Sequence, residues 1–339
     1  MEMNILQLFA ENPQVNVTTD AGLSAENKTF YDRALIEEAG PNLIHGQFGQ
    51  KRPIPKNGGK RIQFRRYAGL PKALKPLTEG VTPEGRKLSA TAVEAEVNQY
   101  GDFVCLSDVL DLTAIDNNVL EATKAVGRQA GMTLDTITRN VLQSGTNVYY
   151  CPKVDAAGKQ TPVEDRAQLD KTCTLTVDVV KKVAAMLKAA NAPKFGEDYV
   201  CILHPYVAYD IMTDPRWEQM HQYCKPEEQF RGEIGRIAGV RFVETSEAAV
   251  YTGAENQCPT GLAVFGCLFV ANGAYGVTEV TGGGLETIIK QLGSAGTADP
   301  LNQRSTVGWK ALQTAEILQQ PYLYRVECCS AFSPDAKMN

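Results

Sequence analysis

The spacing of apolar residues along the chain predicts two helices in its first half. Residues 1–22 show little periodicity and are predicted to form an extended arm without a core of its own. Ser24 then caps a predicted helix that ends at Gly40. Asp116 caps a longer helix that continues to Gly145, and at about 1.5 Å per residue it would be roughly 43 Å long. Its apolar stripe consists of Val126, Ala130, Leu134, Ile137 and Val141.

The second half of the chain is predicted to be a compact mixture of helices and strands. A helix begins at Thr176 and is stopped by Pro193, and another begins with Pro205 as its first residue. Short apolar runs predict buried strands between and after these helices. The predicted strands span 199–203, 240–243, 262–270, 306–318 and 322–329.

Residues 51–87 interrupt this pattern with a strong local charge. They hold eleven basic and two acidic residues, a net charge of +9, whereas the whole chain carries −5 and the remainder therefore −14. Alternation at 61–65 and at 88–106 predicts two strands, joined by a loop tip rich in proline. The result would be a long two-stranded ribbon from about 60 to 105. Such a ribbon is too polar to form a core and should need another chain to lie on.

Composition narrows the class of protein. The chain has 339 residues, of which 43% are apolar and 22% charged, as in ordinary globular proteins. Its negative net charge argues against generic wrapping of nucleic acid. Nine scattered cysteines without a CxxC motif favour buried thiols in a reducing compartment. The sequence shows no secretory signal, and no apolar run approaches the roughly 20 residues of a membrane span.

No motif predicts catalysis, a cofactor or a metal. The histidines, His45, His204 and His221, lack metal-ligand spacing. Cys201 and His204 could form a thiol nucleophile and its base, but a packed thiol and a helix cap explain them better. The glycine run 282–284 is followed by no phosphate-loop signature and is interpreted as a turn. An intracellular Cys/His hydrolase is therefore a distant hypothesis.

Two functions could explain the basic ribbon, besides a hairpin that is merely solvated. It could dock onto the acidic remainder of an identical chain, where opposite charges would set the register. It could instead bind single-stranded nucleic acid, using its basic residues with Phe64 and Tyr67. The extended arm, the unsupported ribbon and the long helix favour assembly, because each leaves surface that only a neighbour can cover.

Six segments of the chain carry a resemblance to a known family: KRPIPKNGGK (51–60), PLTEGVTP (76–83), QYGDFV (99–104), GRQAGMTLD (127–135), GRIAGVRFVET (235–245) and DPLNQ (299–303). The chain resembles the major capsid proteins of Enquatrovirus-type tailed phages and their prophage relatives. The similarity runs in the same order from about residue 18 to 332.

The resemblance implies an α+β class and the Hong Kong 97-like phage capsid fold, with an N-arm, an E-loop, a spine helix, a P-domain and an A-domain. The implied divisions are an N-terminal arm (1–22), a first helix and connection (23–56), the E-loop ribbon (57–105), the spine helix and P-domain (106–169), the A-domain (170–295) and the P-domain C-terminal strands (296–339).

The function implied by the resemblance is structural, not enzymatic. Copies of the chain would assemble as hexamers and pentamers into an icosahedral shell that encloses double-stranded DNA without reading its sequence. Scaffolding, portal and decoration proteins are the further partners it allows, and no membrane is involved. The protein would reside in the virion, and in the host cytoplasm during assembly. A single-strand nucleic-acid-binding module using the ribbon 51–87 is the alternative.

The basic residues of the ribbon are the candidate inter-subunit contacts: Arg61, Arg65, Arg66, Lys72, Lys75, Arg86 and Lys87. Some members of the wider fold cross-link a lysine to an asparagine between chains. Lys72, Lys75 and Lys87 would lie on the E-loop, and nothing in the sequence selects one of them.

Overall fold

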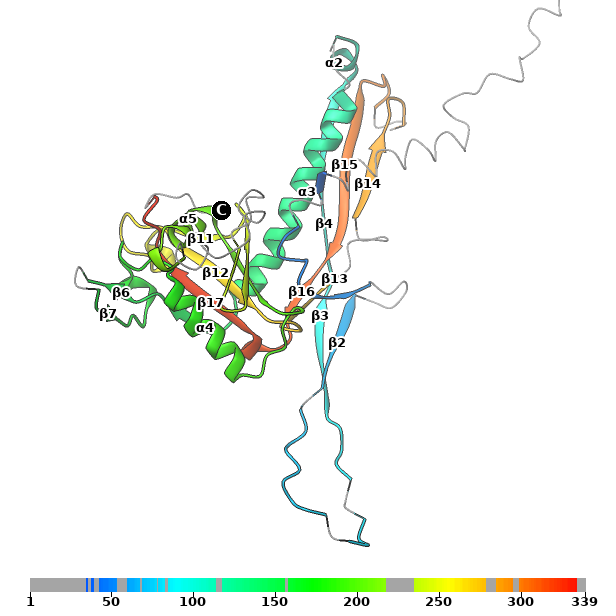
Figure 1. Ribbon diagram of the computed structural model, residues 1–339. Helices are drawn as coiled ribbons and strands as arrows, with labels where there is room; N and C mark the ends of the chain where they lie inside the picture. The colour runs from blue at the N-terminus through cyan, green and yellow to red at the C-terminus, as the bar shows by residue number, and fades with distance from the viewer. Residues whose placement is uncertain are drawn as a thin grey trace, which may run out of the picture.

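The computed structural model consists of an elongated blade and a rounded body beside it (Figure 1). The blade contains a long helix, α3, a three-stranded sheet and a hairpin that ends in a long loop. The structure describes residues 35, 38–39, 43–53, 60–67, 69–77, 79–82, 85–113, 118–155, 158–217, 235–278, 285–294 and 299–333. The predicted arm, 1–22, lies outside these residues.

Helix α3 (Asn118–Gln143) is the axis of the blade and confirms the predicted long helix. It packs on a sheet in the order β14 (Leu285–Lys290), β15 (Arg304–Gln313), β4 (Asn98–Ser107). Of the predicted stripe, Val126, Ala130 and Leu134 are fully buried and pack against the sheet residues Trp309 and Ala311. The short helix α2 (Asp108–Thr113) follows β4 directly and precedes α3 in the chain.

The backbone around Leu35 packs closely against α3 at Gly127. Leu35, Glu38 and Ala39 are helical, and the rest of the predicted helix over 24–39 lies outside the described residues. Leu35 is buried in the core of the blade. A Cβ added to Gly127 would lie 3.0 Å from the Leu35 carbonyl oxygen, so a larger residue there would have to push the two segments slightly apart.

The rounded body is built on a seven-stranded sheet. Its order is β5-β17-β12-β8-β10-β9, with β11 paired to β12, and β8 and β10 run parallel. The strands are β5 (Val148–Tyr150), β8 (Tyr199–Leu203), β9 (Arg236–Ile237), β10 (Val240–Glu244), β11 (Ala249–Tyr251), β12 (Val264–Val270) and β17 (Leu323–Cys328). The predicted strand over 199–203 is confirmed at both ends.

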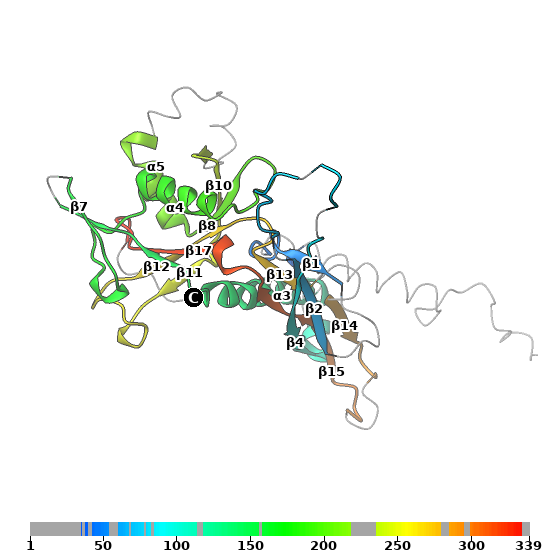
Figure 2. The same ribbon diagram turned by 90° about the horizontal axis from the view of Figure 1, so that it is seen from below.

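Both faces of this sheet are covered, which explains the unbroken apolar runs in its strands. Cys201 and Leu203 face α4 (Val177–Ala189) and α5 (Pro205–Met212). Val200 and Ile202 face the end of α3 at Leu142. Figure 2 shows α4 and α5 on one side of the sheet and α3 on the other.

Smaller elements join the body to the blade. The strands β1 (Gln50–Arg52), β13 (Tyr275–Thr278) and β16 (Ala315–Ile317) form a three-stranded sheet at the junction. A small hairpin, β6 (Lys153–Val154) and β7 (Gln160–Thr161), projects from the body (Figure 1). The described residues also include the short 3₁₀ helices Arg166–Gln168, Ala254–Asn256 and Gln320–Tyr322.

The ribbon is shorter than the sequence predicted. Only β2 (Arg61–Tyr67) and β3 (Ala90–Glu96) pair with each other. The prediction of a two-stranded ribbon as far as 105 is wrong, because β4 pairs along its whole length with β15. Val97 alone separates β3 from β4, so the two strands run on from hairpin to sheet over roughly 60 Å.

The last strand also lies elsewhere than predicted. Both C-terminal strands were expected to join the sheet beside the long helix. β15 does so, whereas β17 pairs with β12 and β5 in the body, where both of its faces find apolar partners. Among the helices that the structure describes, none is long and apolar enough to cross a membrane.

Candidate functional site

The hairpin β2–β3 is held at the junction between blade and body by a small core of its own. Ile62 and Phe64, on one face of β2, are buried with Ala95 and Val97 against Leu318. The expectation that the ribbon has no core therefore applies only beyond its base. The loop that the hairpin carries starts from a fixed position.

Phe64 fits into a space that a glycine leaves open. Its ring is completely buried and lies over Gly276 of β13. A Cβ on Gly276 would overlap the ring carbons, so any other residue there must displace the ring. The guanidinium of Arg66 adds a polar contact and donates to the Leu318 carbonyl oxygen at 3.2 Å.

Beyond the base, the loop between β2 and β3 exposes large apolar side chains. The exposed fractions are 83% for Leu74 and 77% for Leu77, and those of Leu70, Val81 and Leu88 lie between 59% and 64%. Exposed apolar residues are ordinary when single, but a series of them on one projecting loop marks a contact surface. These residues were not predicted as contacts, because they lack periodicity. Their signal was the presence of leucines in a segment without a core.

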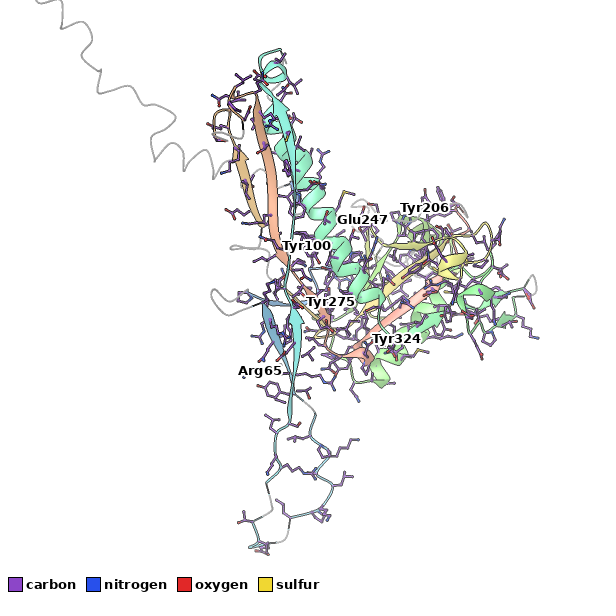
Figure 3. All side chains as sticks on the ribbon, turned by 180° about the vertical axis from the view of Figure 1, so that it is seen from behind. Arg65, Tyr100, Tyr206, Glu247, Tyr275 and Tyr324 are labelled. Carbon is purple, nitrogen blue, oxygen red and sulfur yellow. The ribbon has the colours of Figure 1, made fainter. Side chains whose placement is uncertain are left out.

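The structure divides the seven predicted basic contacts into two groups. Three make bonds within their own chain: Arg61 with Glu94 at 3.4 Å, Arg66 with Leu318, and Arg86 with the Pro71 carbonyl oxygen at 3.4 Å. In the described part of the chain, the other four have neither a hydrogen bond nor an ion pair: Arg65, Lys72, Lys75 and Lys87. Figure 3 places Arg65 on the side of the hairpin that faces away from the body.

A buried polar cluster ties the start of this region to α3. The Asp135 carboxylate accepts the His45 backbone N–H at 2.7 Å, and the His45 ring Nδ1 lies 2.6 Å from its other oxygen. The Tyr275 hydroxyl donates to the His45 carbonyl oxygen. His45 and Asp135 are 1% and 0% exposed. Three elements, the 43–48 segment, α3 and β13, thus meet at one residue.

Cys201 and His204 do not form a catalytic pair. Cys201 is fully buried, and burial raises the pKa of its thiol well above the ordinary value. Burial lowers the pKa of His204, whose Nδ1 accepts the Tyr206 N–H at 3.1 Å as the cap of α5. Among the described contacts, no hydrogen bond joins the two side chains. The interpretation as packed thiol and helix cap is the one that the contacts support.

Of the cysteines that the structure describes, seven are buried as free thiols and Cys105 is exposed. The eight cysteines that the structure describes form no disulfide, and the sulfurs of Cys267 and Cys328 are 3.9 Å apart. A hydrogen bond with Cys328 and then burial raise the pKa of the Cys267 thiol, and a hydrogen bond with Cys151 and then burial raise that of Cys328. In the described ranges, no three His, Cys, Asp or Glu side chains are arranged to hold a metal ion.

Comparison with solved structures identifies the fold. The chain is similar to the capsid of Ralstonia phage GP4 (15% identity, TM-score 0.60), covering 87% of this chain and 90% of that one. It is equally similar to the capsids of the cyanophages P-SCSP1u and Pam1, each with 13% identity and a TM-score of 0.60. These matches cover 87% of this chain and 89% and 92% of the respective cyanophage chains. They confirm the α+β, Hong Kong 97-like capsid fold.

Comparison of sequences supplies the family. No curated protein sequence matches the chain. A family model described as phage capsid protein matches residues 98–279, from the start of β4 to just after β13. The matched segment is more than half of the chain and includes α3 and most of the seven-stranded sheet, so this chain belongs to the phage capsid protein family.

Proposed function

We propose that copies of this capsid protein assemble as hexamers and pentamers into an icosahedral shell around the double-stranded DNA genome of a tailed phage. The observation that carries the proposal is the loop between β2 and β3, whose leucines its own chain leaves exposed. Covering each leucine would contribute about 1.5–3 kcal/mol, so the loop gains most when a neighbouring copy covers it. The free cations Lys72, Lys75 and Lys87 add charge complementarity.

The same proposal assigns a role to each part of the subunit. The hairpin and its loop act as the E-loop, α3 as the spine helix and the rounded body as the A-domain, with 1–22 as the arm. The phage would be of the Enquatrovirus type, which the segments quoted from the sequence support. The role is structural and needs no cofactor, and the buried state of Cys201 supports this. Scaffolding, portal and decoration proteins are partners, and assembly takes place in the host cytoplasm.

The test separates the apolar from the charged part of the loop. Leu74→Ser/Leu77→Ser removes apolar contact, and Lys72→Glu/Lys75→Glu/Lys87→Glu reverses charge. Both sets are exposed, so the unassembled subunit should unfold at the same urea concentration as the wild type. Assembly, followed by sedimentation and electron microscopy, should need at least a tenfold higher protein concentration, since 1.4 kcal/mol corresponds to a factor of ten.

The matched control is Lys181→Glu/Lys188→Glu, which reverses exposed charges on α4. It should fold and assemble as the wild type does. Failure of the wild-type protein to form particles, or normal particles from both loop variants, would refute the proposal. If the charge-reversed variant lost only affinity for a single-stranded oligonucleotide, the nucleic-acid-binding alternative would replace it.

A further inference from the structure

A basic groove lies between β1 and β2, on the outer face of the hairpin. Its volume is about 540 Å³. Pockets that hold small molecules measure roughly 300–1,000 Å³. The residues that line it are Gln50, Arg52, Gln63, Arg65 and Tyr67. All five belong to one chain, so an unassembled subunit already contains the groove, whether or not copies form a shell.

The two arginines of the groove have no anionic partner among the described residues of their own chain. Arg52 and Arg65 are exposed, and within the described residues neither makes a hydrogen bond or an ion pair. None of the five lining residues is acidic. The carboxylate of Glu94, opposite Gln63 on β3, is already bound by Gln63 at 2.9 Å and by Arg61 at 3.4 Å. The groove therefore favours an anionic ligand.

A phosphate group suits this pair of arginines. The guanidinium group presents its N–H donors in a planar fork that binds two oxygens of a phosphate at once. A terminal phosphate has three such oxygens, and a chain of phosphates has more, so one ligand can bond to Arg52 and Arg65 together. A single carboxylate has only the two oxygens that one fork occupies. The donors of the groove therefore favour a phosphorylated ligand.

Tyr67 adds an aromatic surface next to one of the arginines. Its side chain is 57% exposed and lies two residues after Arg65 on the same face of β2, about 6.6–7 Å along the strand. Opposite these two residues, β3 places only Ala92 and Ala90, which leave room beside the tyrosine ring. Nucleic-acid bases stack on exposed aromatic rings of this kind. The arginines and the tyrosine together therefore suit a ligand that carries both phosphate and a base.

We propose that this groove binds a nucleotide, with its phosphate groups on Arg52 and Arg65 and its base on the Tyr67 ring. The nucleotide can come from two sources, a free nucleoside triphosphate or one unit of a nucleic-acid strand, because both present phosphate next to a base. The bound phosphates would neutralise part of the +9 charge of residues 51–87.

Calorimetric titration of the full-length, unassembled subunit with dATP and with inorganic tripolyphosphate tests the site. Arg52→Gln/Arg65→Gln should weaken binding of both probes by about tenfold or more, because each lost fork is a charge-assisted contact. The matched control is Lys51→Gln/Lys60→Gln, which removes the same charge from exposed neighbours that do not line the groove. It should raise the Kd less than about threefold, since exposed charges act weakly at a distance. The urea midpoint of unfolding should be the same for both variants and the wild type.

A third variant, Tyr67→Leu, separates the base from the phosphates. It should weaken binding of dATP by about tenfold and leave tripolyphosphate binding unchanged, because only dATP has a base to stack. An unchanged affinity for dATP would refute the contact with Tyr67.

Two results would overturn the site itself. One is failure of the wild-type subunit to bind either probe. The other is equal weakening by the arginine and lysine variants, which would show attraction to diffuse charge. A single-stranded oligonucleotide distinguishes the sources. If it binds more tightly than dATP and competes with it, the ligand is a unit of a nucleic-acid strand. If it binds more weakly than dATP, the ligand is the free nucleotide.

Discussion

Removing the Asp135 carboxylate should be among the costliest single changes in the blade. Asp135 accepts two hydrogen bonds from His45, at 2.7 Å from the backbone and 2.6 Å from the ring, in a site that water does not reach. A hydrogen bond to a charged group contributes about 1.5–3 kcal/mol, and breaking a buried pair costs about 3–5 kcal/mol. We therefore expect Asp135→Ala to lower the free energy of unfolding by about 4 kcal/mol.

The assay is equilibrium unfolding of the unassembled subunit in urea, followed by circular dichroism. Asp135→Asn is the conservative control, because it keeps the volume and one acceptor and should cost about 1–2 kcal/mol. A double-mutant cycle with His45→Ala isolates the side-chain contact from the backbone hydrogen bond. A loss below 1 kcal/mol for Asp135→Ala, or strictly additive losses in the cycle, would show that the cluster does not hold the three elements together.

Three further changes test other parts of the structure. Gly276→Ala should displace the Phe64 ring and speed amide hydrogen exchange in β2 and β3 while the seven-stranded sheet keeps its protection; unchanged exchange in the hairpin would contradict the packing. Burial lowers the pKa of His204 below its ordinary 6.5, so the unfolded chain binds the proton more readily. The stability due to neutral His204 is therefore complete above about pH 6.5 and declines as the pH falls. His204→Asn can still cap α5 but does not titrate in this range. In this variant the urea midpoint of unfolding should therefore depend less on pH between about pH 7 and 5. Arg166→Met removes one of the two arginines that hold the buried Glu327 carboxylate and leaves Arg325 Nε at 2.9 Å from it, so the variant should lower the free energy of unfolding in urea by about 2 kcal/mol; an unchanged urea midpoint would contradict this.

The sequence predicted the elements of this fold better than their partners. Periodicity located α3 and the strand 199–203 because it depends only on neighbours along the chain. The pairing of β4 with β15 joins residues some two hundred positions apart, and local pattern carries no information about it. The single residue Val97 was too small a break to separate two strands of similar composition.

The same limit applies to polar residues on α3. Asp135, Arg139 and Gln143 have the composition of a solvated helix face, yet all three are buried. Their partners come from distant segments, such as the Glu247 carbonyl oxygen for Arg139 and the Gly266 carbonyl oxygen for Gln143. Charge counting did find the basic loop, because an excess of +9 over a short segment does not depend on tertiary partners. A charge count could not show that Arg66 donates a hydrogen bond to a carbonyl oxygen of its own chain.

The near-continuity of β3 and β4 makes the loop the far end of a lever. The break at Val97 is bridged, since its backbone N–H donates to the Lys60 carbonyl oxygen at 2.8 Å, and the strand resumes at once in the sheet of the blade. A small rotation of that sheet swings the loop tip through a larger arc. Two copies that meet at different angles therefore need either a different tilt of the blade or a bend at Val97. In the proposed shell, curvature would thus depend on the point where the hairpin leaves the sheet, far from the exposed loop.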